Sequence, residues 1–225
     1  MRNSSLAPRR VSARLFLACF CALALPLLSA RAQTKYVQVP GKASVKIDGT
    51  STLHEWEMEG HQIGGLIELP AAVEFDQAAG KVSGLQDGKL PATVHAHISI
   101  STITSKAEHL PEVMNSLMQD NLKAADFPVI FYSGKTLTLT NSAPGKPFDF
   151  AATGDLGIAG VTNTISFPVS FEQTDATHLE VKGQATFKMT DFKITPPAPH
   201  PPGFSAPLKC GDDVTIKIDW LLHKK

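Results

Sequence analysis

A histidine–glutamate pair is the first feature of this sequence that could do chemistry. The segment His54-Glu55-Trp56-Glu57-Met58 begins like the metal-binding helix of a zinc protease, which needs a second histidine four residues after the first. Position 58 is methionine, and the alternation of side chains around it predicts a strand instead of a helix. This segment therefore cannot place two histidine ligands on one helical face.

His95 and His97 form a second candidate metal pair, because residues two apart in a strand point to the same side. They share parity with Thr93 and Ser99, whereas the apolar residues between them have the opposite parity. The pair is therefore expected on the outward face. A metal-dependent barrel enzyme that uses His95 and His97, with His54 or His61 as a third ligand, is kept as an alternative function.

Nucleophilic and phosphate-binding motifs are not recognisable. No Ser, Cys or Thr stands in a nucleophile-elbow context, and Gly154-Asp155-Leu156-Gly157 reads as a turn signal instead of a phosphate loop. Cys210 has no activating base near it in the sequence, which favours a small buried residue. We predict no catalytic residue, no metal site and no cofactor, so the protein is not expected to be an enzyme.

The strongest chemical signal is apolar. If the apolar strand faces point inward, large aromatic and sulfur-containing side chains alternate in the interior with small Gly154, Gly183 and Ala185. Such mixing leaves space, and a large cavity lowers stability unless something fills it. The residues expected to line a ligand channel are Trp56, Phe131, Phe150, Phe167, Phe171, Phe187 and Trp220, with Met58, Phe148 and Met189 also facing inward.

His54 has the parity of Trp56, so it is either a surface residue or a hydrogen-bond partner for a polar ligand head group. A barrel packed solid, acting through its surface as an interaction module, is the alternative to a ligand-filled interior.

Strands must position these residues, because alternation of apolar and polar side chains dominates the chain after residue 33. It is clearest over 179–189, 165–171 and 214–222, and further strands are predicted over 36–47, 52–69, 93–102, 129–140 and 148–158. The long strand 52–69 is expected to bend at Gly64-Gly65. About eight strands suit a single closed antiparallel β-barrel, an all-β fold.

Two segments break the alternation. Ser105 and Glu108 have capping-box spacing, and Leu110, Met114, Leu117 and Met118 follow at helical intervals, which predicts one short amphipathic helix. The stretch 195–207 contains six prolines and Gly203, and predicts a stiff loop at a barrel mouth.

The first residues have the composition of a signal peptide. A basic start precedes an apolar run over 15–28, and Ala30-Arg31-Ala32 resembles a peptidase site. An uncleaved anchor is the alternative, although the run is short for a membrane span. We expect 1–32 to be removed and 33–225 to form one exported domain in the periplasm or outside the cell, without stable membrane insertion.

Charge and cysteine content limit the kinds of partner and crosslink that are expected. The formal net charge of the full 225-residue chain is +0 at pH 7 and no basic stripe is present, so no nucleic-acid partner is expected. Cys19 and Cys21 lie in the predicted signal peptide, which leaves Cys210 and excludes an intramolecular disulfide. A homodimer crosslinked through Cys210 stays open.

Four stretches together resemble the YceI-like family of lipocalin-like, polyisoprenoid-binding periplasmic proteins. They are Ser51 to Trp56, Glu108 to Phe131, Gly154 to Thr162, and Ala185 to Ile194 with Gly211 to Ile216. The resemblance implies an apolar channel along the barrel axis that holds an isoprenoid tail, such as that of a polyprenyl lipid or a quinone, for carriage or sequestration. The proline-rich stretch is longer than the family's usual connection, and Cys210 stands where the family more often has an aliphatic residue.

Overall fold

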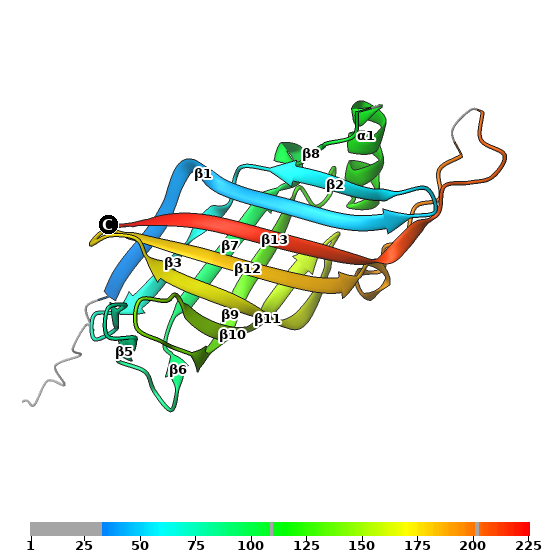
Figure 1. The fold of residues 1–225 in the computed structure, drawn as a ribbon. Helices are drawn as coiled ribbons and strands as arrows, with labels where there is room; N and C mark the ends of the chain where they lie inside the picture. The colour runs from blue at the N-terminus through cyan, green and yellow to red at the C-terminus, as the bar shows by residue number, and fades with distance from the viewer. Residues whose placement is uncertain (1–32, 109, 201–202) are drawn as a thin grey trace, which may run out of the picture. The chain divides into compact units, whose positions relative to one another are not determined.

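The computed structural model describes residues 33–108, 110–200 and 203–225, and most of them lie in strands. Eight strands close into an antiparallel barrel in the order β13-β12-β11-β10-β9-β7-β3-β1, with β1 pairing back onto β13 (Figure 1). Their bounds are β1 (Gln33–Ser51), β3 (Gly64–Pro70), β7 (Thr93–Ser99), β9 (Val129–Asn141), β10 (Phe148–Ile158), β11 (Val161–Gln173), β12 (His178–Lys188) and β13 (Cys210–Lys224). The predicted fold class, a closed eight-stranded barrel with one helix, is confirmed.

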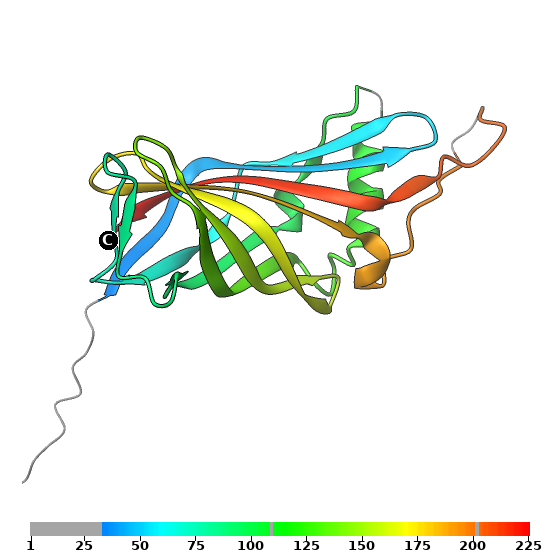
Figure 2. The ribbon, with the colours of Figure 1, turned by 60° about the horizontal axis from the view of Figure 1, so that its bottom comes forward.

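Shorter elements complete the fold at the two ends of the barrel. They are β2 (Glu55–Gly60), β4 (Glu74–Asp76), β5 (Lys81–Ser83), β6 (Lys89–Leu90), β8 (Thr104–Ser105), α1 (Pro111–Asn121) and the 3-10 turns η1 (Ile100–Thr102) and η2 (Met189–Phe192). α1 lies at the same end as the proline-rich segment, and the β4–β5 hairpin lies at the opposite end (Figures 1 and 2). No helix in the described residues is long and apolar enough to cross a membrane.

The predicted strand over 52–69 is two strands. β2 pairs with the second half of β1 and β3 with its first half, and residues 61–63 separate them. The break faces an irregularity in β1 between Gln38 and Ala43, and the Gln38 side-chain carbonyl accepts a hydrogen bond of 2.7 Å from the Gly65 N–H. Gly65 has φ +131°, which other residues rarely adopt, so the expected glycine bend lies where the strand resumes.

The turn predicted at Gly154–Gly157 is wrong, because these residues lie inside β10. The turn that joins β10 to β11 is Ala159-Gly160, whose φ angles of 50° and 79° suit a two-residue hairpin. The glycines serve packing instead: the Tyr132 ring lies against Gly154 and the Phe131 ring against Gly157. A side chain at either glycine would overlap its aromatic neighbour.

The predicted capping box at Ser105 is also wrong, although the helix forms. Ser105 belongs to β8, where it pairs with Met58 of β2, and α1 begins at Pro111 after Leu110 in the left-handed region. The helix is held instead by Asn115, whose side-chain carbonyl accepts a hydrogen bond of 2.6 Å from the Ser105 N–H. Tertiary pairing of Ser105 therefore overrides its local capping tendency.

Aromatic side chains close the end of the barrel opposite α1. Phe148, Phe150 and Phe171 are almost fully buried, and Phe75 from the β4–β5 hairpin packs on them with ring centroids 5.5 Å from Phe148 and 6.1 Å from Phe171. Phe150 and Phe171 lie 5.1 Å apart. Buried aromatic pairs of this kind add to the area-based stabilisation of the core, and here they form a plug.

Replacing Gly65 with alanine is expected to destabilise the barrel strongly. The new Cβ would overlap the His95 carbonyl oxygen in β7, in addition to the strain at φ +131°. We expect the free energy of unfolding to fall by about 3 kcal/mol or more. Gly88→Ala is the control, because Gly88 has φ +75° with nothing within 4 Å, and should lose only about 1 kcal/mol. Equal losses in urea titrations would contradict the proposed clash.

Candidate ligand cavity

A cavity of about 100 Å³ lies inside the barrel, bounded by side chains from β3, β7, β9, β10, β11, β12 and β13. Apart from His97, its lining is aliphatic and aromatic, and the small residues Ala152, Gly183 and Ala185 face it at positions where larger side chains would fill it. This main cavity follows from strand alternation, because the inward positions of the closed sheet are the apolar ones.

A second cavity of about 110 Å³ lies under α1. Met114, Leu117, Met118 and Leu122 form its helical wall, as the predicted apolar helix face requires, and the barrel contributes Trp56, Met58, Met189 and Val214 among others. Ile130, Phe187 and Ile216 line both cavities. These three side chains therefore separate two chambers along one apolar interior.

The predicted channel residues divide between the two cavities and the plug. Phe167, Phe171, Phe187 and Trp220 line the main cavity, and Trp56 lines the second one. Phe150 is buried behind Phe171 and belongs to the aromatic plug, where it does not line either cavity.

Phe131 lines the predicted cavity only from its edge, and His54 lies outside both cavities. Phe131 of β9 borders the main cavity, but it is 41% exposed. Its ring covers Gly157 of the neighbouring strand β10. His54 is exposed in the turn between β1 and β2, next to Ser51, whose hydroxyl accepts a hydrogen bond from the His54 N–H. His54 lines neither cavity.

Tyr132 is an inward residue that strand parity did not predict. Its ring packs edge-on against Phe167, with centroids 5.3 Å apart, and lines the main cavity. Residues 129–132 are all apolar or aromatic, so alternation does not reveal their inward face. The sequence feature that could have revealed the inward position of Tyr132 is Gly154. A glycine at that place on the neighbouring strand leaves the room that the Tyr132 ring fills.

Two buried polar atoms of residues that line the main cavity have no hydrogen-bond partner among the described residues. They are the Tyr132 hydroxyl and the Trp220 indole N–H, both buried. Burial, with a smaller contribution from the Asp155 carboxylate, raises the pKa of Tyr132 to about 12. Both groups are therefore neutral donors at physiological pH, and unpaired donors of this kind carry a desolvation cost.

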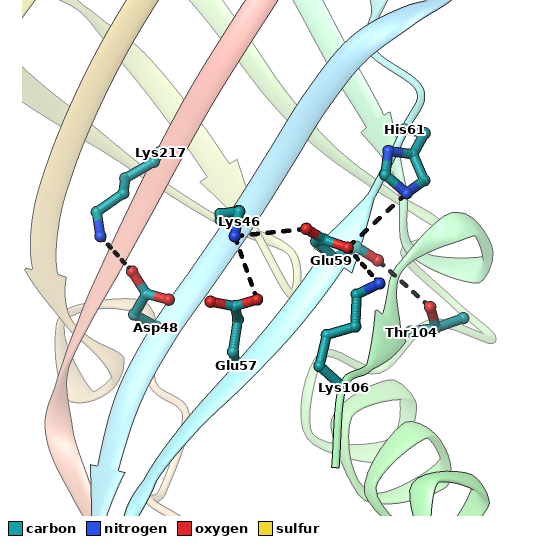
Figure 3. A network of polar contacts seen from close by, with 8 residues as sticks. All are labelled: Lys46, Asp48, Glu57, Glu59, His61, Thr104, Lys106 and Lys217. Carbon is teal, nitrogen blue, oxygen red and sulfur yellow. Dashed lines mark hydrogen bonds and ion pairs between the residues drawn. The ribbon is translucent and has the colours of Figure 1, made fainter. Parts of the chain in front are cut away.

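Charged side chains lie on the outside of the barrel. No Asp, Glu, Lys or Arg in the described part of the chain lines either cavity. Figure 3 shows an outer ion-pair network across β1 and β2, in which Lys46 contacts Glu57 and Glu59, and Lys106 contacts Glu59 at 2.5 Å. The hydrogen bond from Lys106 is the main cause that lowers the pKa of Glu59. The interior is thus left without formal charge.

His95 and His97 are exposed on β7, and the His97 ring lies over Gly64. Within residues 33–108, 110–200 and 203–225, no group of three or more His, Cys, Asp or Glu is placed to hold a metal ion.

Comparison with known proteins identifies the family. Residues 36–221 match the YceI-like domain. The chain belongs to the YceI-like family. No curated protein matches it significantly.

Two solved structures of similar fold accompany this YceI-like match. A polyisoprenoid-binding domain from Saccharophagus degradans, described as implicated in plant cell wall breakdown, has 12% identity and a TM-score of 0.57, covering 84% of this chain and 98% of its own. BcnA from Burkholderia cenocepacia has 18% identity and a TM-score of 0.51, covering 79% of this chain and 95% of its own. At these identities the likeness establishes the YceI-like fold alone.

The Tyr132→Phe substitution is expected to stabilise the ligand-free protein. It removes an unpartnered buried hydroxyl and keeps the ring that packs on Phe167. We expect the free energy of unfolding to rise by about 1 kcal/mol, measured by denaturant titration of delipidated protein. Tyr36→Phe is the control, because the Tyr36 hydroxyl is not among the buried unpartnered atoms. A loss of stability in Tyr132→Phe would show that this hydroxyl has a partner.

Tyrosine ionisation should be delayed at alkaline pH. In the Tyr36→Phe variant Tyr132 is the remaining tyrosine, and its tyrosinate absorbance should appear near pH 12 instead of 10. Since the pKa is raised in the folded state, its contribution to stability is complete below pH 10 and is lost as the pH rises toward 12. A midpoint near 10 in folded protein would place Tyr132 in water.

Proposed function

We propose that this protein binds an isoprenoid lipid inside its barrel and carries or sequesters it outside the cytoplasm, without chemical conversion. The observation that carries the proposal is the pair of adjoining apolar chambers, lined by Phe167, Phe187 and Trp220 on one side and by Trp56 and the α1 methionines on the other. The description of the Saccharophagus relative as a polyisoprenoid-binding domain supports it.

The dimensions favour a slender chain. Each chamber, at about 100 and 110 Å³, is smaller than the roughly 300–1,000 Å³ of a drug-sized pocket, so a large fused-ring ligand fits poorly. A linear tail can occupy one chamber after the other once Phe187 and its neighbours Ile130 and Ile216 rotate aside. At about 0.3 kcal/mol per heavy atom, a nanomolar affinity without a charged anchor would need roughly forty buried carbons, so the short part of a tail that fits the two chambers gives a weaker affinity.

The polar groups of the lining favour a neutral ligand oxygen. The Tyr132 hydroxyl and the Trp220 indole N–H are donors without a protein acceptor among the described residues, and a carbonyl or ether oxygen would satisfy them. A phosphate would bring charge into a lining to which the described residues contribute no Lys or Arg, at a large desolvation cost. We therefore propose a tail with a neutral oxygen, such as a prenylated quinone, inside the barrel.

Export to the periplasm or the exterior is part of the proposal. It rests on the signal-like composition of residues 1–32, which lie outside the described residues. The boundary at 33 and the single domain 33–225 are proposed on the same ground.

Filling the main cavity should weaken lipid binding. We expect Ala185→Phe, which adds a ring on the cavity lining, to weaken binding of a long-chain prenyl quinone at least tenfold. Gln184→Phe is the matched control, because Gln184 is the exposed neighbour on the same strand. Binding is measured by quenching of tryptophan fluorescence, and thermal unfolding verifies that both variants fold. A folded Ala185→Phe variant with unchanged affinity would contradict an internal site, as would tighter binding of the matching polyprenyl phosphate.

A further inference from the structure

The barrel wall is incompletely paired between β11 and β12. β10 pairs with β11 along the whole length of β10, from Ile158↔Val161 to Phe148↔Phe171. The β11–β12 ladder runs only from Gln173↔Leu179 to Val169↔Gly183, although β11 extends back to Val161 and β12 onward to Lys188. The two strands diverge beyond this point (Figure 2).

Pro168 explains where the ladder ends. In a two-residue hairpin the residues that flank the turn, here Ile158 and Val161, exchange hydrogen bonds, so alternate residues of β11 bond to β10. Pro168 falls on the other set, whose N–H groups face β12. The next bonded pair of the β11–β12 ladder would be Pro168 with Gln184, and proline has no N–H to donate. Pairing therefore stops at Val169.

A hydrogen bond limits the separation of β11 from β12 near the start of β11. The Asn163 side-chain amide, near the start of β11, donates a hydrogen bond of 2.7 Å to the carbonyl oxygen of Asp191 in η2, directly after β12. The opening is a window between this bond and the Val169↔Gly183 pair. Its length along β11 is about six residues of extended chain, or roughly 20 Å.

The main cavity lies directly behind this window. Ile165 and Phe167 of β11 and Ala185 and Phe187 of β12 face inward and line the cavity, yet all are partly exposed. Phe171 and Val181, the inward pair in the hydrogen-bonded half of the same two strands, are buried. Exposure of inward side chains therefore coincides with the unpaired segment.

We propose that the window between β11 and β12 is the lateral portal through which an apolar chain enters and leaves the main cavity, an inference that rests on the proposed function. Thr164, Ser166 and Thr186 are exposed on the outer side of the window. Their hydroxyl groups pair with Asp155 and Thr153 of β10 and with Thr215 of β13, so they do not bridge the opening. Phe187, in edge contact with Phe192 at 5.1 Å, stands at the window and lines both chambers, so its rotation admits a chain to either one.

The two ends of the barrel are less suitable entrances. Phe75, Phe148 and Phe171 plug one end. At the other end the helix α1 lies over the second cavity, and Asn115 ties it to β8 through the bond from the Ser105 N–H. Entry through the window requires no strand or helix to separate.

Bridging the window should slow ligand exchange without changing affinity. In a Cys210→Ala background, Ser166→Cys and Thr186→Cys place thiols on outward positions that would be register partners if the ladder continued. After reaction with a short bismaleimide, we expect uptake and release of all-trans-retinol, followed by its fluorescence, to slow at least tenfold with the same Kd. Ser170→Cys with Lys182→Cys is the control pair, because Ser170 and Lys182 are partners inside the ladder.

The outcomes separate the portal from the proposed function. Failure of the unbridged protein to bind retinol or a prenyl quinone would sink the proposed function. Binding with unchanged exchange rates after bridging Ser166 to Thr186 would overturn the portal alone. Equal slowing by the control bridge would also overturn it, since general stiffening would then be the cause.

A single substitution provides an independent test. Pro168→Val restores the missing N–H at an exposed position and should extend the ladder toward Gln184. We expect the backbone amide introduced at position 168 to be protected from hydrogen exchange, and retinol exchange to slow severalfold. Thr164→Val is the control, because it keeps its backbone donor. Protection of the new amide together with wild-type rates of retinol exchange would contradict the portal.

Discussion

The ladder between β1 and β13 is the interaction on which the rest of the structure depends. It runs from Tyr36↔Lys224 to Ser51↔Cys210 and closes the sheet, so that every strand has one face in water and one face inside a tube. An eight-stranded tube can be filled by its own side chains or can hold one slender ligand. Ala152, Gly183 and Ala185 on the inner face favour the second outcome, because they leave a cavity that larger residues would close.

The irregular strand pairing and the unpartnered hydrogen-bond donors both lie next to the main cavity. Pro168 withholds one donor from the wall, and the inward side chains beside that gap are partly exposed. Tyr132 and Trp220 hold donors without partners among the described residues against the main cavity. A barrel whose only task was stability would gain from a paired strand and from phenylalanine at position 132. The unfavourable features therefore fit a protein whose interior is completed by a ligand oxygen and an apolar chain.

The fold was largely predictable from sequence and the details of the site were not. Alternation over 165–171, 179–189 and 214–222 is unambiguous, so the inward positions of Phe167, Phe187 and Trp220 follow from it. In β9 residues 129–132 are all apolar or aromatic, and only the neighbouring glycines decide that Tyr132 points in and Phe131 out. The capping box at Ser105 failed for a related reason, because pairing with Met58 in a distant strand outweighs local capping. A single sequence does not reveal which distant strands pair with each other.

Native mass spectrometry of the exported protein, purified without organic solvent or delipidation, would decide whether the barrel holds a lipid. We expect one neutral isoprenoid bound per chain, released by organic extraction and lost in a folded Ala185→Phe variant but retained in Gln184→Phe. Protein of bare polypeptide mass that also fails to take up prenyl quinones would contradict an internal lipid site and would favour a barrel that acts through its surface.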